Sequence, residues 1–244
     1  MIHTPVLPDG WSLIALDSVG STNDEAARLA DGGAPEGTVV WAREQQGGRG
    51  RRGRSWASPP GNLYSSTILR PDCPAPRAAE LGFVAALAVG DLVPASRAIR
   101  LKWPNDVLVD GGKIAGILLE SAIAQDGRVE HVVAGIGVNV SFAPQLAEMR
   151  YPGASLGGSV EAALEGLTRA FAARLAQWRR DGFGVVREAW LAQAGPLGAE
   201  VDVRLGEGLV RGRFAGLDHE GALLLDTADG PRKIVSGELL GRAA

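Results

Sequence analysis

The stretch IRLKWPNDVLVDGGKIAGILLESAIAQDGRVEHVVAGIGVNV, residues 99–140, decides the expected fold class. Apolar runs at 99–102, 114–122 and 129–140 are rich in β-branched residues and predict three strands. The turn Gln125-Asp126-Gly127 is too short for a crossover helix, so it joins the last two strands as antiparallel neighbours. We therefore predict an antiparallel meander in this part of the chain.

The residues before this stretch alternate between strand and helix patterns. Strands are predicted at 12–16, 38–42 and 63–69, and helices from 22 to about 32 and over 77–92. Thr22 and Glu25 form a capping-box pattern, which predicts Thr22 as the N-cap of the first helix. Together with the meander, these elements predict an α/β (α+β) domain built on a mixed sheet.

After residue 140 the pattern is first helical and then β. Apolar residues at helical spacing predict a long helix between Val160 and Trp178, and a shorter helix follows over 185–193. Gly195-Pro196-Leu197-Gly198 then interrupts the helical pattern. Four short strands follow, at 200–205, 209–217, 222–226 and 232–235. We therefore predict two domains, 1–195 and 196–244, the second a small β-barrel of SH3-like size.

The composition is that of an ordinary soluble protein, with 45% hydrophobic residues and a formal charge of -3. This charge argues against a protein that coats nucleic acid, because such binding needs Lys and Arg to neutralise phosphates. Cys73 is the only cysteine, so no intrachain disulfide can form and a reducing, cytoplasmic location is expected. The longest apolar run, residues 81–93, contains Asp91 and is too short to span a bilayer, so we predict a buried helix and no membrane partner.

Positive charge is concentrated in the loop that follows the second predicted strand. GRGRRGR at 48–54 holds four arginines, whereas the other 21 basic residues face 28 acidic ones. Glycines let backbone N–H groups approach an anion closely, and arginine binds phosphate or carboxylate with two parallel hydrogen bonds. The loop therefore predicts an anion site, with a merely solvated basic loop as the alternative.

The same loop matches the pattern G-x-G-x-x-G, which also occurs in dinucleotide-binding Rossmann folds. That motif must open a helix, but SWASPPG at 55–61 contains two prolines and does not continue as one. There is also no P-loop motif, so arginine side chains and loop amides are the expected phosphate ligands. Trp56, just after the loop, either stacks on a base or stiffens the loop, or is a buried core residue.

Five short motifs occur in order along the chain: STN at 21–23, QQGGRGRRGRSW at 45–56, KWPND at 102–106, KIAGIL at 113–118 and GIGVN at 135–139. Each is weak alone, but together the chain strongly resembles the biotin protein ligases from about residue 13 to its end. The resemblance implies a catalytic domain related to class II aminoacyl-tRNA synthetases, followed by an SH3-like domain. It also implies that ATP activates biotin as biotinyl-5'-AMP, and that biotin then passes to a lysine of a biotin carboxyl carrier protein.

Some members of this family carry an N-terminal DNA-binding domain that represses transcription. Here the STN motif begins at residue 21, so the resemblance is to the short form, and no DNA partner is expected. The resemblance is also compatible with a homodimer.

The resemblance further implies the site residues. The biotin contacts are Ser21, Thr22, Asn23, Gln45, Gly48, Arg49, Gly50, Arg51, Lys113 and Gly116. The ATP and adenylate contacts are Arg49, Arg51, Arg54, Trp56, Lys113 and Asn139, and the segment from Asn139 through residue 156 covers the adenylate. The expected catalytic residues are Lys113, Arg51 and Asp106, and Asp106 has three open roles: orienting the acceptor lysine, helping to bind Mg²⁺, or capping the bend after Pro104. Mg²⁺ is expected because it accompanies the phosphates of ATP.

The chemistry explains why such a site needs fixed cations. Attack of a carboxylate on the α-phosphate of ATP brings two anions together. A fixed cation at about 4 Å from an anion contributes roughly 4 kcal/mol at an effective dielectric of about 20. Arg49, Arg51 and Lys113 are the residues expected to supply this charge, whereas Lys102 is expected to be a solvated lysine.

Two other functions were weighed. Lipoate or octanoate ligation uses a related fold and an acceptor lysine, but the KWPND motif together with the arginine loop favours biotin. An RNA-binding module would use the arginine loop and the small barrel. The acidic remainder of the chain and the lack of aromatic residues among the arginines weigh against it.

Overall fold

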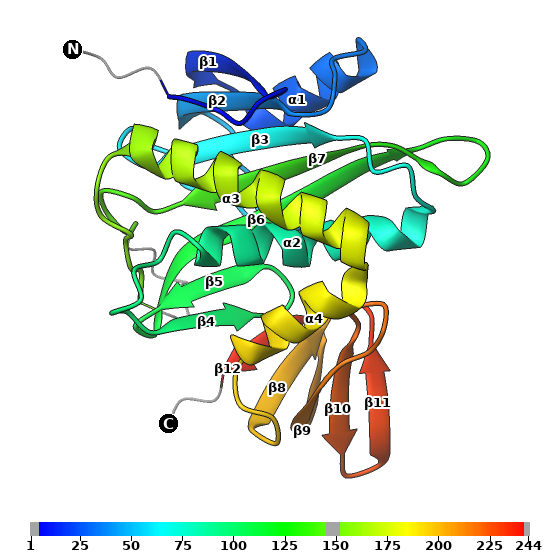
Figure 1. Cartoon of the computed structure of the whole chain (residues 1–244). Helices are drawn as coiled ribbons and strands as arrows, with labels where there is room; N and C mark the ends of the chain where they lie inside the picture. Colours follow the sequence, from blue (N-terminus) through cyan, green and yellow to red (C-terminus); the bar gives the residue numbers. More distant parts are fainter. Residues whose placement is uncertain (1–4, 145–151, 242–244) are drawn as a thin grey trace.

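The computed structural model describes residues 5–144 and 152–241. Its larger sheet has seven strands in the order β1-β2-β3-β7-β6-β5-β4 (Figure 1). The strands are β1 Ser12–Val19, β2 Thr38–Gln45, β3 Leu63–Leu69, β4 Ile99–Lys102, β5 Asp106–Val109, β6 Gly112–Ile123 and β7 Val129–Val138. β1 and β2 pair in parallel and all other neighbours are antiparallel, which confirms the predicted mixed sheet and meander.

The hairpin of β4 and β5 was only half predicted, since the sequence pattern stopped at Pro104. β5 pairs with β4 on one side and with β6 on the other, and Lys102 lies opposite Asp106 in the register. Four residues are too few for a clear alternating pattern. The strand is stabilised by pairing on both sides and by burial of Val107 and Val109.

Helices cover both faces of the sheet. They are α1 Thr22–Asp31, α2 Glu80–Gly90, α3 Val160–Asp181 and α4 Phe183–Ala192. α1 packs Ala26 and Ala30 against Val40 of β2, whereas Val39, which points to the other face, joins the main core with α2 and α3. Figure 1 shows α3 crossing in front of the sheet.

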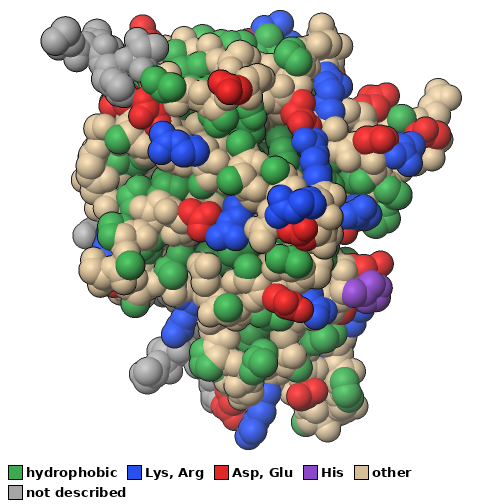
Figure 2. Space-filling view, in the orientation of Figure 1, with side chains coloured by type: hydrophobic (Ala, Val, Ile, Leu, Met, Phe, Trp, Pro, Cys, Tyr) green, Lys and Arg blue, Asp and Glu red, His purple; other side chains and the backbone are tan. Residues whose placement is uncertain are grey.

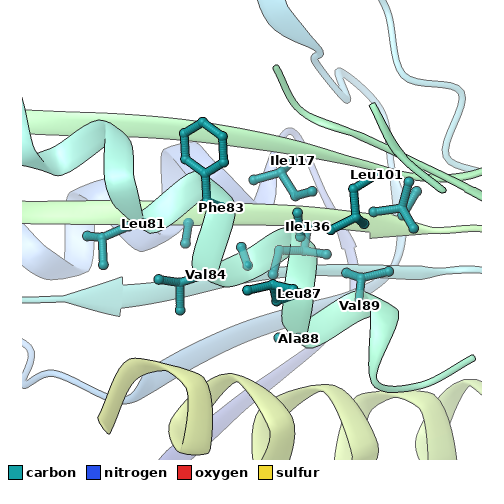
Figure 3. Close-up of a cluster of buried hydrophobic side chains, with 14 of the residues drawn as sticks. Leu81, Phe83, Val84, Leu87, Ala88, Val89, Leu101, Ile117 and Ile136 are labelled. Carbon is teal, nitrogen blue, oxygen red and sulfur yellow. The ribbon is translucent and has the colours of Figure 1, made fainter. Parts of the chain in front are cut away.

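Helix α2 is the centre of the main core. Nearly all of its residues are buried, because the sheet covers one side and α3 covers the other. Figure 3 shows Leu87 and Val84 of this helix among neighbours that include Ile117 and Ile136 of the sheet. The prediction of a buried helix in the run 81–93 is therefore confirmed. No helix among residues 5–144 and 152–241 is both long and apolar enough to cross a membrane.

A second, smaller sheet follows α4 and lies below the first in Figure 1. It is wholly antiparallel, in the order β11-β10-β9-β8-β12. Its strands are β8 Glu200–Leu205, β9 Gly208–Leu217, β10 Leu223–Thr227, β11 Gly230–Ile234 and β12 Glu238–Gly241. The sequence predicted the first four but not β12, which is short and ends at a glycine. Glu238 of β12 pairs with Arg54 of the arginine loop.

Candidate active site

A pocket of about 830 Å³ opens on the face of the sheet that carries α1. Its wall combines the start of α1, the glycine–arginine loop (residues 46–62), strands β6 and β7, and the second sheet. From the second sheet, Arg204 of β8 and Glu238 of β12 line it. The pocket therefore lies where the two sheets meet.

Glycines form the floor of the pocket. Gly116 of β6 and Gly137 of β7 are register partners, and the indole of Trp56 lies on both. A Cβ at Gly137 would lie 2.6 Å from Trp56 Nε1, so a larger residue would displace the ring. Lys113 Nζ lies 5.3 Å from the centre of that ring. Of the two alternatives for Trp56, the structure places it in the pocket wall rather than in the core.

Uncharged hydroxyl and amide groups of Ser21, Thr22, Asn23 and Gln45 line one end of the pocket, and buried Ser66 supports Thr22 and Asn23 from behind. We call these five residues the neutral end. Thr22 donates to Gln45 Oε1 from its backbone N at 2.8 Å and from its hydroxyl at 3.0 Å. Gln45 Nε2 in turn donates to Ser58 at 2.9 Å. These bonds fix the orientation of the Gln45 amide before any ligand arrives.

The predicted capping role of Thr22 is wrong. The N-cap of α1 is Ser21, which makes no side-chain cap hydrogen bond, and Thr22 is the first helical residue. The hydroxyl of Thr22 is turned toward Gln45 and is no longer available to the helix N–H groups. The hydrogen bond to Gln45 therefore takes the place of the cap that the sequence pattern suggested.

Ser66 is a neutral-end residue that the sequence analysis missed. It is completely buried in β3, and its hydroxyl lies 2.8 Å from Thr22 Oγ1 and 2.6 Å from Asn23 Oδ1. A hydroxyl has one hydrogen, so it donates to one of the two at a time. The signal was the run Ser65-Ser66-Thr67 inside an otherwise apolar strand.

Gly48 and Asn23 show how tightly the neutral end is packed. A Cβ at Gly48 would lie 2.5 Å from Ser58 Oγ, directly behind Gln45. A Cβ at Gly135 would overlap the side-chain amide of Asn23, which itself donates to Glu120 at 2.6 Å. Gly48 therefore supports the pocket from behind and is not among its lining residues.

Ionised groups gather at the other end of the pocket, which we call the charged end (Arg51, Arg54, Lys102, Asp106, Lys113 and Glu238). Asp106 receives Lys113 Nζ on Oδ1 at 2.6 Å and Lys102 Nζ on Oδ2 at 3.0 Å. Burial alone would raise the pKa of Asp106, but the two ammonium groups outweigh it and hold that pKa below its usual value. Asp106 is thus an ionised carboxylate shared by two lysines.

The expectation that Lys102 is a solvated lysine is wrong. Its side chain is 7% exposed and it lines the pocket. It is the last residue of β4, and strand pairing places it opposite Asp106, where the carboxylate compensates its burial. The sequence could not reveal this, because the partner depends on a hairpin that the pattern did not predict.

The glycine–arginine loop contacts both helix α1 and the second sheet. Arg49 donates to Asp24 at the start of α1 at 2.7 Å. Arg54 pairs with Glu238 at 2.8 Å, and Arg51 donates to the backbone carbonyl of Gly237 at 3.4 Å. A short 3-10 helix, Arg51–Gly53, lies between these contacts. The second sheet therefore helps to hold the arginines over the pocket.

Most of the predicted contacts converge on this one pocket. The predicted residues that line it are Ser21, Thr22, Asn23, Gln45, Arg49, Gly50, Arg51, Arg54, Trp56, Asp106, Lys113 and Gly116. Asn139 does not line it, and donates instead to the carbonyls of Lys113 at 3.1 Å and Ala154 at 3.2 Å. Of the predicted adenylate-covering segment, residues 145–151 lie outside the described residues.

The side chains of the pocket offer few ligands for a metal ion. Within the described part of the chain, no three His, Cys, Asp or Glu side chains gather as metal ligands. The two carboxylates that line the pocket, Asp106 and Glu238, are both paired with cations. These residues suit a magnesium ion carried by the phosphates of a nucleotide, which needs few protein ligands.

A mixed sheet joined to a small β sheet, with a pocket that has an uncharged end and a cationic end, suits a ligase that activates a carboxylate with a nucleotide. The Biotin/lipoate A/B protein ligase family matches residues 16–139, and the Biotin protein ligase C terminal domain matches residues 197–239. The chain belongs to the biotin protein ligase family.

Individual relatives agree with this assignment. The chain is 44% identical over 234 residues to a biotin--[acetyl-CoA-carboxylase] ligase of Paracoccus denitrificans, covering 90% of this chain and 96% of the relative. It is 37% identical over 244 residues to the bifunctional ligase/repressor BirA of Bacillus subtilis, covering 94% of this chain and 74% of that protein. The biotin protein ligase from Aquifex aeolicus in complex with biotin and ATP superposes with a TM-score of 0.77 at 29% identity, over 93% of this chain and 97% of that one.

Proposed function

We propose that this pocket binds biotin at its neutral end and ATP at its charged end, and joins them as biotinyl-5'-AMP. The enzyme then transfers the biotinyl group to one lysine of a biotin carboxyl carrier protein. The observation that supports this most is the convergence of motifs that lie far apart in the sequence on one pocket. The Aquifex aeolicus relative binds the same two substrates.

In the first step, a carboxylate oxygen of biotin attacks the α-phosphorus of ATP. The bond from that phosphorus to the bridging oxygen breaks, and pyrophosphate leaves. Lys113 and Arg51 lie at the charged end, where they would offset the repulsion between the two anions and stabilise the charge that develops. ATP would enter with Mg²⁺ on its phosphates.

In the second step, the ε-amine of the acceptor lysine attacks the acyl carbon of the adenylate. A C–N bond forms, the C–O bond to AMP breaks, and the amine proton passes to water. Asp106 is the carboxylate of the pocket that lies nearest to Lys113, so we assign it the orientation of the incoming amine. The reaction suits a cytoplasmic enzyme, where ATP and carboxylase acceptors are found together.

Two alternatives are weaker. The relatives named above are biotin ligases, so lipoate ligation is not favoured. An RNA-binding role would need an extended basic surface. Arg49 and Arg54 of the loop pair with Asp24 and Glu238, and the opposite face, which α3 covers, carries basic and acidic side chains interspersed (Figure 2).

The proposal is tested by ATP–pyrophosphate exchange with the full chain. We expect exchange that depends on biotin and does not occur above background when lipoate or octanoate replaces it. Exchange with lipoate but not with biotin would contradict the proposal. Salt-dependent retention of RNA in the absence of any exchange would favour the RNA-binding alternative.

A further inference from the structure

Two of the three lysines in this chain meet on a single carboxylate. Lys102 and Lys113 both bind Asp106, whereas Lys233 lies in the second sheet and pairs with Asp218. The two active-site lysines come from neighbouring parts of one meander, at the end of β4 and the start of β6. Nearly all other cations of this chain are arginines, so the placement of two lysines on one carboxylate is unusual for this sequence.

The two lysines differ in burial. Removing an ammonium group from water is costly unless it is well paired, and Lys102 is the more buried of the two, with its side chain 7% exposed against 22% for Lys113. Lys102 is therefore the lysine that burial holds more firmly beside Asp106, whereas Lys113 is more accessible from the pocket.

The two lysines approach different oxygens of Asp106. Lys113 holds Oδ1 and also faces the ring of Trp56 in the pocket wall. Lys102 holds Oδ2 from the end of β4. If Lys113 turns from Asp106 to the carboxylate and phosphate of the substrates, Oδ1 becomes available while Oδ2 keeps its partner.

We propose that Lys102 is a positioning residue for the transfer step, and that it keeps Asp106 ionised and fixed while Lys113 serves the substrate anions. Oδ1 of Asp106 is then free to accept a hydrogen bond from the amine of the acceptor lysine. This inference rests on the proposed function of the pocket. It assigns Lys102 to the second half of the reaction, whereas Lys113 acts in the first.

The surroundings of Asp106 support this division of roles. Burial favours the protonated acid, and the charges of Lys113 and Lys102 oppose it. Arg51 is the other cation that faces this carboxylate, and Glu238 lies close enough to Lys102 to interact with it electrostatically. Once Lys113 has turned to the substrates, Lys102 is the cation that remains in direct contact with Asp106.

The test separates the two half-reactions. Biotinyl-5'-AMP is first formed on the enzyme, and its transfer to a purified biotin carboxyl carrier domain is then followed in a single turnover across pH 5.5 to 9. The variants are Lys102→Met, which removes the charge, and Lys102→Arg, which keeps it. Arg100→Met is the matched control, because Arg100 is exposed and lies two residues earlier on the same strand.

We expect Lys102→Met to slow transfer by about 30-fold, less than the roughly 10²-fold or more lost with a group that itself transfers a proton, and to slow adenylate formation by only about threefold. Because Asp106 would lose a cationic partner, its pKa should rise, and the acidic limb of the transfer profile should move to higher pH. Lys102→Arg should recover most of the rate and the original profile. Arg100→Met should behave as the unchanged enzyme.

Equal losses in both half-reactions without a change in the pH profile would overturn the proposal, and so would an unchanged transfer rate. If Lys102→Met does not fold, Lys102→Gln is measured in its place and judged by the same criteria. Failure of the wild-type enzyme to form any adenylate with biotin would instead overturn the proposed function. The two failures are therefore distinguishable.

Discussion

The two ends of the pocket are held together in different ways. At the neutral end, Thr22, Gln45 and Ser66 hold their positions through hydrogen bonds within the protein, which form without a ligand. At the charged end, cations are held by carboxylates: Lys113 by Asp106 and Arg54 by Glu238. The polar groups of the neutral end are therefore fixed in one arrangement before a ligand binds. At the charged end, the cations can exchange protein carboxylates for substrate anions.

This difference suggests how binding and chemistry are divided. A pre-arranged set of hydrogen bonds loses little entropy when a ligand arrives, which favours selective recognition. A cation that moves from a protein carboxylate to a substrate anion keeps a partner throughout, so it is never left buried and unpaired. Damage to the charged end should therefore reduce the rate, and damage to the neutral end should reduce the affinity for biotin.

The largest effect is expected at Lys113 of the charged end. Lys113→Ala should lower biotin-dependent pyrophosphate exchange by about 10³-fold, the upper range for removing one group that stabilises developing charge. The variant also leaves Asp106 with Lys102, so the fold should persist. Exchange rates at saturating substrates, together with thermal melting, measure the two effects separately.

Lys233→Ala is the matched control, because Lys233 is the lysine outside the site and pairs on the surface of the second sheet. It should exchange at the wild-type rate. If Lys113→Ala raised only the KM for biotin and left the rate at saturation intact, the charged end would contribute to affinity alone. The proposed contrast between the two ends would then be lost.

The neutral end should respond differently. Ser66→Ala removes a hydroxyl that supports Thr22 and Asn23 from behind, and a lost buried hydrogen bond costs roughly 1–3 kcal/mol. We expect the KM for biotin to rise about tenfold at this energy scale, with kcat within about a factor of two. Steady-state kinetics with varied biotin measure both constants.

Ser121→Ala tests whether any serine on the sheet has this effect, since Ser121 lies exposed on β6. It should change neither constant. A fall in kcat for Ser66→Ala with an unchanged KM would show that the neutral end acts in the chemical step. The assignment of the neutral end to biotin recognition alone would then be wrong.

The sequence predicted what local patterns and contiguous motifs record. The strands of the meander, the buried helix α2 and the arginine loop were all visible in short windows of sequence. Ser66, Lys102 and Glu238 were not, because each obtains its role from a partner far along the chain or on another strand. Thr22 shows the converse. Its local sequence pattern predicted a helix cap, but its hydroxyl donates to the distant side-chain amide of Gln45 instead.

The smallest effect is expected where the charged end meets the second sheet. Glu238→Gln weakens the pair with Arg54, whose side chain is 60% exposed, so the loss should be at most about 1 kcal/mol. We expect the KM for ATP to rise about threefold, as for the loss of a mostly exposed ion pair, with the KM for biotin unchanged. The exposed Glu207, in the turn between β8 and β9, is changed to Gln as the matched control, and it should leave both constants unchanged.

The pH dependence of this pair has a defined sign. Burial would raise the pKa of Glu238, but the guanidinium of Arg54 outweighs it and the pKa is held below its usual value near 4.5. The carboxylate therefore stabilises the fold fully above pH 4.5, and this contribution is lost as the pH falls through the lowered folded-state pKa. Melting temperatures of wild type and Glu238→Gln should differ by a constant amount above pH 5 and converge in more acidic solution. A difference that grew toward low pH would mean that Glu238 is protonated in the folded protein, and that the second sheet holds the arginine loop by something other than this ion pair.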